Sequence, residues 1–138
     1  MATARAIGGR LPQFFEYYGR KPSRAERAVE REVFGTGWGI TSYTTTEQAE
    51  TLAEALRVGP GARVLDIGSG TGWPGLYLAD RTGCRAVLTD VPRDAIRSAA
   101  GNAYRHGLAT TCGFAVARGE RLPFRPGTFD AVLHSDVL

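Results

Sequence analysis

An acidic residue followed by three closely spaced glycines is the pattern in this sequence with the clearest chemical meaning. Asp66 precedes Gly68, Gly70 and Gly72, with Ser69 inside the same turn. Glycines at this spacing allow backbone conformations that let a ligand approach the main chain closely. Because a carboxylate repels phosphate, Asp66 disfavours a phosphorylated ligand and favours one that carries a positive charge.

A second acid ends the next apolar run. Asp90 follows Gly72 by 18 residues, and an acid about 20 residues beyond such a turn commonly accepts hydrogen bonds from the ribose hydroxyls of a nucleotide. The alternative is that Asp90 caps a helix that starts near Pro92. The two roles do not exclude each other, and the ribose role is compatible with several nucleotide cofactors.

The stretch from Asp66 to Gly72 resembles the first motif of the class I S-adenosylmethionine-dependent methyltransferases, an acid followed by a glycine-rich turn. S-adenosylmethionine has an ammonium and a sulfonium group and no phosphate. The resemblance implies that Asp66 and the backbone of residues 68–72 bind the methionine portion. It also implies that Asp90 binds the ribose and that Val91 flanks the adenine.

A third landmark of this family is altered. Leu122–Phe124 reads Leu-Pro-Phe, which many small-molecule methyltransferases carry after their third strand. Those relatives usually have Gly-Asp a few residues earlier, and the Asp accepts from the adenine amino group; this chain has Ala117 and Arg118 there. Glu120, or backbone groups near Arg118 and Gly119, could replace that acid. A solvated charged loop is the alternative interpretation.

A histidine follows the fourth landmark, an apolar run at residues 131–133 that resembles the family's fourth strand. His134, Ser135 and Asp136 come directly after it, where residues lie at the mouth of the crevice in open α/β sheets. His134 could act as a general base at neutral pH. The alternative is a histidine with only a structural role.

The elements needed to position these residues alternate between strand and helix. Apolar runs predict strands at 63–67 and 85–90, a third from about 114 and a fourth at 129–133, with helices after Pro74 and at 94–106. This alternation predicts an α/β, Rossmann-like, doubly wound and mostly parallel sheet. The family's sheet normally has seven strands, so we expect a chain truncated after the fourth. An oligomer or a partner chain would then cover the open edge of that strand.

Residues 1–57 are expected to form an N-terminal helical extension, or lid, over an incomplete S-adenosylmethionine-binding core at 58–138. This extension is rich in aromatic residues. Trp38 and Tyr43 could pack on the bound cofactor as part of a lid. The alternative is that these aromatic side chains anchor the extension to the core.

Local signals predict two helices in this extension. Ser23 and Glu26 form a capping box for a helix that runs to about Phe34, with Ala25, Val29 and Val33 along one face. Thr44–Thr46 begin a second, amphipathic helix, with Gln48 or Glu47 completing its cap. Glycines and Pro12 predict that the first dozen residues are irregular.

Composition favours a cytoplasmic protein. The 17 basic residues exceed the 14 acidic ones only mildly, and the basic residues near the N-terminus alternate with acids. This charge pattern does not favour a nucleic-acid substrate. No apolar run reaches membrane length and no signal region is visible. Cys84 and Cys112 lack metal-ligand spacing and are expected to be free thiols in a reducing compartment.

We therefore expect a metal-independent S-adenosylmethionine-dependent methyltransferase with a small-molecule acceptor. The sequence lacks the Asn/Asp-Pro-Pro-aromatic run that marks many amino-group and nucleic-acid methyltransferases. One alternative is an inactive cofactor-binding fragment or assembly module. Another is an NAD-linked oxidoreductase, because Gly70, Gly72 and Gly75 also match the dehydrogenase fingerprint; Asp66 and Pro74 argue against it.

Overall fold

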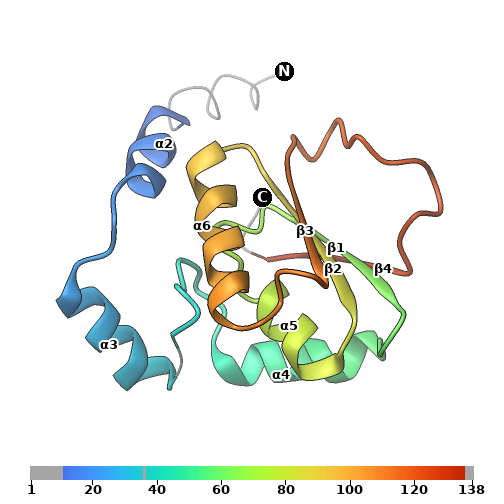
Figure 1. Cartoon of the computed structure of the whole chain (residues 1–138), viewed down its shortest axis with the longest axis horizontal. Coiled ribbons are helices and arrows are strands. Elements are labelled where there is room, and N and C mark those ends of the chain that lie inside the picture. The colour runs from blue at the N-terminus through green and yellow to red at the C-terminus, as the bar shows by residue number, and fades with distance from the viewer. Residues whose placement is uncertain (1–10, 36, 136–138) are drawn as a thin grey trace.

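The centre of the protein is a four-stranded parallel sheet (Figure 1). The computed structural model describes residues 11–35 and 37–135. The strands are β1 (Arg63–Ile67), β2 (Arg85–Asp90), β3 (Cys112–Val116) and β4 (Ala131–His134), in the order β3-β2-β1-β4. The Rossmann-like α/β fold predicted from the sequence is confirmed.

The strand order determines where the functional edge lies. β1 pairs in parallel with both β2 and β4, and Asp66 is in register with Leu88 on one side and Leu133 on the other. The carboxyl ends of all four strands therefore meet at the same edge of the sheet. The chain runs outward from β1 to β3 and then returns to the other side of β1, so a topological switch point lies between β1 and β4.

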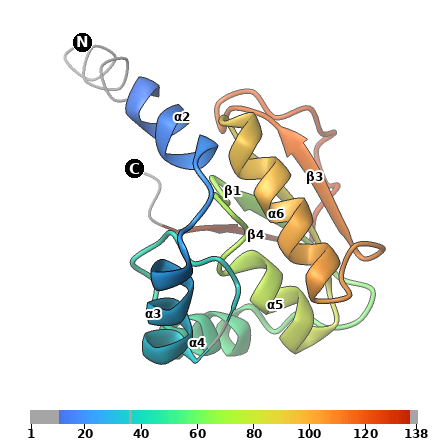
Figure 2. The ribbon, with the colours of Figure 1, turned by 60° about the vertical axis from the view of Figure 1, so that its left-hand side comes forward.

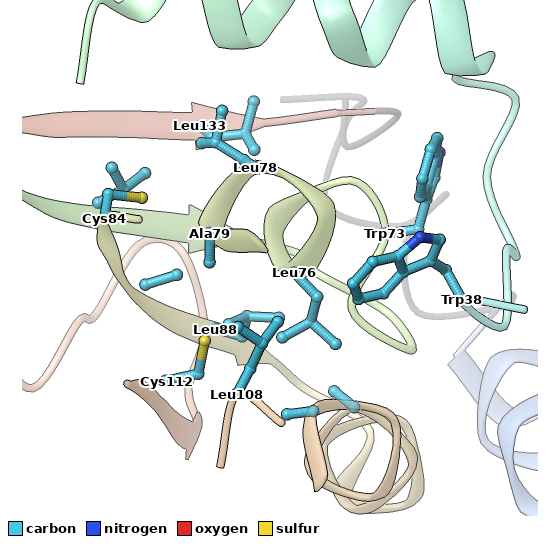
Figure 3. Close-up of a cluster of buried hydrophobic side chains, with 14 of the residues drawn as sticks. Trp38, Trp73, Leu76, Leu78, Ala79, Cys84, Leu88, Leu108, Cys112 and Leu133 are labelled. Atoms are coloured by element: carbon cyan, nitrogen blue, oxygen red, sulfur yellow. The ribbon is translucent and has the colours of Figure 1, made fainter. Parts of the chain in front are cut away.

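Two helices pack against strands of this sheet, and a third packs against one of those two. They are α4 (Thr46–Leu56), α5 (Gly75–Thr82) and α6 (Arg93–Arg105). Side chains from alternate strand positions share a face, and here Val64, Leu88 and Leu133 join side chains of these helices in one buried cluster (Figure 3). Burial of these apolar side chains is the main source of stability.

The N-terminal part contains two more helices, α2 (Leu11–Gly19) and α3 (Arg24–Phe34). Figure 2 shows both on the same side of the molecule, beside the core. Helix α2 contradicts the prediction of an irregular first dozen residues for residues 11 and 12, and the rest of that stretch lies outside the described residues. Pro12 is compatible with a helix there because backbone N–H groups of the first turn have no helical acceptor.

The capping predictions are confirmed. Ser23 forms a reciprocal capping box with Glu26 at the start of α3, and Thr45 forms one with Gln48 at the start of α4. The two helices differ in burial: α4 buries residues against the core, whereas α3, described in full, buries none. Its amphipathic sequence pattern therefore does not mark a face in contact with the core.

We call residues 37–45, which join α3 to α4, the strap. The strap crosses from the extension to the core and contacts both α6 and the loop after β1. Both cysteines are buried and free. Among residues 11–35 and 37–135, no helix combines the length and apolar character needed to cross a membrane.

Candidate functional site

The glycine turn connects the end of β1 to the start of α5. Gly68, Gly70 and Gly72 have φ angles of 70°, 55° and 111°, a region that side-chain-bearing residues rarely adopt. The backbone N–H groups of Gly68 and Ser69 donate to the carbonyl oxygen of Thr89 at 2.8 and 3.0 Å. The turn is thus fixed to β2, next to the predicted ribose-binding acid.

Asp66 lies beneath this turn and is only 1% exposed. Its carboxyl group contacts the first residue of α5, Gly75, at a position where a β-carbon would have no space. Burial raises the pKa of Asp66 well above its ordinary value of 3.8, and the charge of Asp90 raises it further; the nearby N–H of Gly75, which lies outside hydrogen-bonding geometry, opposes the rise. The helix N-terminus favours the ionised form, but burial is the larger effect.

Two polar groups of the turn lack partners. Within the described part of the chain, neither carboxyl oxygen of Asp66 nor the hydroxyl of Ser69 has a hydrogen-bond partner, and all three atoms are buried. A buried polar group without a partner costs about 1–3 kcal/mol. The turn therefore contains a carboxyl and a hydroxyl group whose requirements a polar or cationic ligand could meet.

Asp90, at the end of β2, binds the glycine turn directly. One carboxylate oxygen accepts from Gly70 N at 2.7 Å, and the other accepts from Val91 N at 2.7 Å. Burial raises the pKa of Asp90, and these two N–H groups oppose the rise. Helix α6 follows Pro92 and has no side-chain hydrogen bond at its N-cap, so Asp90 does not have the capping role that was the alternative.

Two hydroxyl groups from the extension lie over the turn. The hydroxyl oxygens of Tyr18 and Thr41 each lie 3.1 Å from the position that a β-carbon on Gly70 would occupy. Burial raises the pKa of Tyr18; a hydrogen bond from Thr41 lowers it, and the charge of Asp90 raises it. Neither residue was predicted to belong to the site, because only the aromatic content of the extension indicated a role and no local pattern distinguishes Tyr18 or Thr41.

The two aromatic residues considered for a lid have different environments. Trp38 is buried and stacks on His106 with ring centroids 3.6 Å apart, and its ring lies perpendicular to that of Tyr77 with centroids 6.2 Å apart. This matches the alternative in which Trp38 anchors the extension to the core. Tyr43 is 92% exposed.

His134 is exposed at the carboxyl end of β4, in register with Ile67. Ser135 follows it and shares a hydrogen bond with the hydroxyl of Thr44. A cavity of about 520 Å³ lies here, lined by Tyr43, Thr44, Gln48, Thr51, Leu52, His134 and Ser135. Asp136 lies outside the described residues. The structure therefore brings His134 to the same sheet edge as Asp66 and Asp90.

The loop after β3 returns toward the end of β1. A β-carbon on Gly119 would lie 3.2 Å from Ile67 Cγ2, so the backbone of this loop approaches the glycine turn. The side chains of Arg118 and Glu120 are exposed, and Val91 is half-buried. Of the residues predicted to meet adenine, Val91 and the backbone at Gly119 lie at the functional edge, whereas the two charged side chains face solvent.

Comparisons with known proteins identify a family and several methyltransferases among the similar proteins. A family model described as a methyltransferase domain matches residues 64–138, which include the glycine turn, Asp90 and His134. The solved structure of a SAM-dependent methyltransferase from Thiobacillus denitrificans, in complex with S-adenosyl-L-homocysteine, is 25% identical with a TM-score of 0.60. It covers 86% of this chain and 45% of that chain.

Curated relatives give the same result. Methyltransferase GfsG of Streptomyces halstedii is 34% identical over 83 residues, which are 60% of this chain and 30% of the relative. A release factor glutamine methyltransferase of Nitratidesulfovibrio vulgaris is 32% identical over 108 residues, 73% of this chain and 36% of the relative. The chain thus spans about a third of the length of these curated relatives.

Proposed function

The chain belongs to the methyltransferase domain family, and we propose that it binds S-adenosylmethionine and transfers its methyl group to a small-molecule acceptor. The observation that carries this proposal is the buried Asp66 carboxyl group beneath the glycine turn, which has no hydrogen-bond partner among the described residues. A cation close to Asp66 would favour its ionised form and offset the cost of burial. A pyrophosphate there would be repelled.

The residues of the turn fit the amino-acid end of this cofactor. Asp66 would attract the positively charged groups, and the backbone of residues 68–72 together with the free Ser69 hydroxyl would bind the rest of the methionine portion. The hydroxyls of Tyr18 and Thr41, which lie over Gly70, would hydrogen-bond to the methionine carboxylate. The negative charges of Asp66 and this carboxylate would then lie on opposite sides of the turn.

The nucleoside end fits the neighbouring strand. Each carboxylate oxygen of Asp90 accepts one backbone N–H and has a further lone pair, so it could accept from the ribose hydroxyls without releasing the turn. Val91 and the backbone at Gly119 would contact adenine, while Arg118 and Glu120 would remain in solvent. Adenine recognition would then rest on main-chain groups rather than on the acid that relatives use.

The chain's own contribution to the reaction would be positioning and proton transfer. When bound, S-adenosylmethionine supplies the electrophilic methyl group, and the protein holds the acceptor in line with it. We place the acceptor in the cavity beside His134, whose volume is within the usual range for small-molecule sites. His134 would accept the proton that the acceptor loses.

The cellular location, the partner chain and the acceptor class are also part of this proposal. We place the enzyme in the cytoplasm, which the two free, buried cysteines support. A partner chain or a second copy along edge strand β4, where Val132 is 52% exposed, is likewise proposed. The name of the Nitratidesulfovibrio vulgaris relative points to a release-factor glutamine, and that of the Streptomyces halstedii relative indicates no acceptor. The small-molecule class proposed for this chain therefore rests on the Leu-Pro-Phe and His-Ser-Asp stretches.

Calorimetric titration tests the cofactor assignment. We expect the protein to bind S-adenosylhomocysteine, and binding of NADH without it would overturn the proposal. Asp66→Ala should weaken S-adenosylhomocysteine binding by at least about tenfold, because a charge-assisted contact is worth about 1.5–3 kcal/mol. Asp80→Ala removes an exposed carboxylate from α5 and should leave the affinity unchanged.

Methyl transfer is tested separately with isotopically labelled cofactor. Incubation with panels of small hydroxylated and amine-containing acceptors, followed by mass spectrometry, should reveal a labelled product. Binding without transfer to any acceptor would favour the alternative of a cofactor-binding module. Transfer to protein or RNA alone would contradict the small-molecule assignment.

A further inference from the structure

Asn102, in the last turn of α6, links the strap to the glycine turn, and we propose that it is a positioning residue for the cofactor. This inference rests on the proposed function, because it concerns the same site. Asn102 is 3% exposed, and nothing in the sequence patterns drew attention to it. It lies at the back of the turn, so it would act through the strap and the turn rather than by touching the cofactor.

The amide of Asn102 joins two segments that are far apart in the sequence. Its Nδ2 donates to the carbonyl oxygen of Trp38, in the strap, at 2.9 Å. It also donates to the carbonyl oxygen of Thr71, in the glycine turn, at 2.7 Å. The side-chain oxygen accepts from Arg105. Both donor positions of a buried amide are therefore used to bridge the two segments.

The strap is shaped to fit this amide. Gly39 has a φ of 73°, and a β-carbon there would lie 2.7 Å from Asn102 Nδ2. The Thr71 hydroxyl donates to the carbonyl oxygen of Gly39, so the strap and the turn are also joined directly. Only a glycine at this position lets the strap lie this close to Asn102.

Further contacts hold the strap on both sides of this bridge. Glu30, from α3, accepts from Gly39 N at 2.6 Å and Ile40 N at 3.2 Å. The Trp73 indole N–H donates to the carbonyl oxygen of Thr44 at 2.8 Å, and this bond is buried. Figure 3 shows Trp38 and Trp73 side by side at one end of the buried cluster. The strap and the turn are therefore one packed unit.

This unit determines where the hydroxyl groups over the turn lie. Thr41 is in the strap, and its hydroxyl is 3.3 Å from that of Thr71 and next to Gly70. If Asn102 no longer bridges Trp38 to Thr71, Thr41 loses its fixed position relative to the turn. Cofactor affinity and the order of the strap should therefore be coupled, and the strap should behave as a wall of the site rather than as an independent lid.

Asn102→Asp is the most direct test, since it keeps the shape of the side chain but sets a carboxylate against two carbonyl oxygens. We expect its affinity for S-adenosylhomocysteine to fall about tenfold or more, as one or two buried donors are lost. Thr71→Val removes the second link between strap and turn without changing side-chain shape. It should weaken binding in the same direction and gives an answer if Asn102→Asp fails to fold.

A matched control separates positioning from stability. Ala103 lies on the same helix as Asn102, is fully buried in the core cluster and makes none of these hydrogen bonds to the strap, so Ala103→Gly is the control. It should lower the melting temperature while leaving the affinity within about twofold of wild type, because it removes neither hydrogen bond of the Asn102 amide.

Two readouts report the coupling itself. The chain has two tryptophans, and Trp38 and Trp73 lie on the two segments that Asn102 joins. Asn102→Asp should therefore increase quenching of tryptophan fluorescence by acrylamide. In hydrogen exchange, S-adenosylhomocysteine should protect amides of both the strap and the turn in wild type, and only those of the turn in the variant.

The outcomes distinguish the two proposals. If wild type binds no S-adenosylhomocysteine, the proposed function is wrong. If wild type binds it and a folded Asn102→Asp or Thr71→Val variant binds equally well, with unchanged protection of the strap, the positioning role is wrong. An equal loss of affinity in Ala103→Gly would also overturn it, because the effect would then follow stability alone.

Discussion

The Asp66 carboxyl group lies directly against Gly75, and a β-carbon on Gly75 would overlap it. The two residues come from β1 and from the first position of α5, so the end of the strand and the start of the helix are packed without an intervening side chain. The dehydrogenase fingerprint, which was the alternative interpretation of these glycines, counts Gly75 as its third glycine. In this structure, Gly75 instead provides the space that the Asp66 carboxyl group occupies.

Gly75→Ala is expected to destabilise the protein by about 1–3 kcal/mol, the usual cost of adding a methyl group to a filled core. Gly101→Ala is the matched control, because Gly101 is inside α6 and a β-carbon there meets only the Arg105 side chain at 3.7 Å. That change should stabilise the protein by up to about 1 kcal/mol. Urea denaturation measures both, and equal effects would show that the contact with Asp66 has no energetic weight.

Asp66→Asn should separate stability from binding. The folded-state pKa of Asp66 is raised by burial, so its contribution to stability is fully present below about 3.8 and is lost as the pH rises through the folded pKa. The asparagine side chain does not titrate, so the variant keeps a constant contribution at this position. Its free energy of unfolding should therefore increase relative to that of wild type as the pH is raised from 3 to 7. It should also bind S-adenosylhomocysteine at least about tenfold more weakly.

Thermal denaturation of both proteins across this pH range provides the check. A stability difference that stays constant with pH would mean that Asp66 is ionised at little cost. In that case the unpartnered carboxyl group would not be the reason for a cationic ligand. Ser69→Ala serves as a control, since it removes the other unpartnered group without removing a titratable one.

Glu26 should titrate far below its ordinary range. Hydrogen bonds from the Arg20 guanidinium and from the backbone and hydroxyl of Ser23 lower its pKa from 4.5 to about 2. The stabilising effect of the ionised Glu26 is thus present above about 4.5 and is lost as the pH falls through about 2. NMR titration should show this value, and Arg20→Ala should raise it. Arg27→Ala should not, because the Arg27 guanidinium donates to the carbonyl oxygen of Pro22.

His134→Gln should lower turnover by about a hundredfold or more without changing the affinity for S-adenosylhomocysteine, as expected for loss of a general base. The chain has two histidines, and His106→Gln is the control: it removes the ring that stacks on Trp38 and should affect stability, not turnover. Full activity of His134→Gln would assign the histidine a structural role.

Local patterns predicted the parts of the site that depend on neighbouring residues. The glycine turn follows from residues 66–72 alone, and Asp90 reaches it because parallel strands end at the same edge of a sheet. Capping boxes are likewise local, and Ser23 and Thr45 begin their helices as the sequence indicated.

The rest of the site depends on tertiary contacts that no pattern encodes. Tyr18 reaches the turn across more than 50 positions of the chain, and Asn102 binds a strap residue 64 positions away. A single hydroxyl or amide has no periodicity to detect. The amphipathic pattern of α3 failed for a related reason: Val29 and Val33 remain 57% and 66% exposed, because a pattern identifies an apolar face but not what lies opposite it.

The position of Asp90 also limits how this protein can change over evolutionary time. One carboxylate holds the amide of Gly70 and, in the proposed complex, the ribose as well. A substitution that altered the nucleoside preference would at the same moment loosen the turn that carries the methionine end. Divergence toward new reactions should therefore begin at the His134 side of the crevice, where residues can vary without such a double effect.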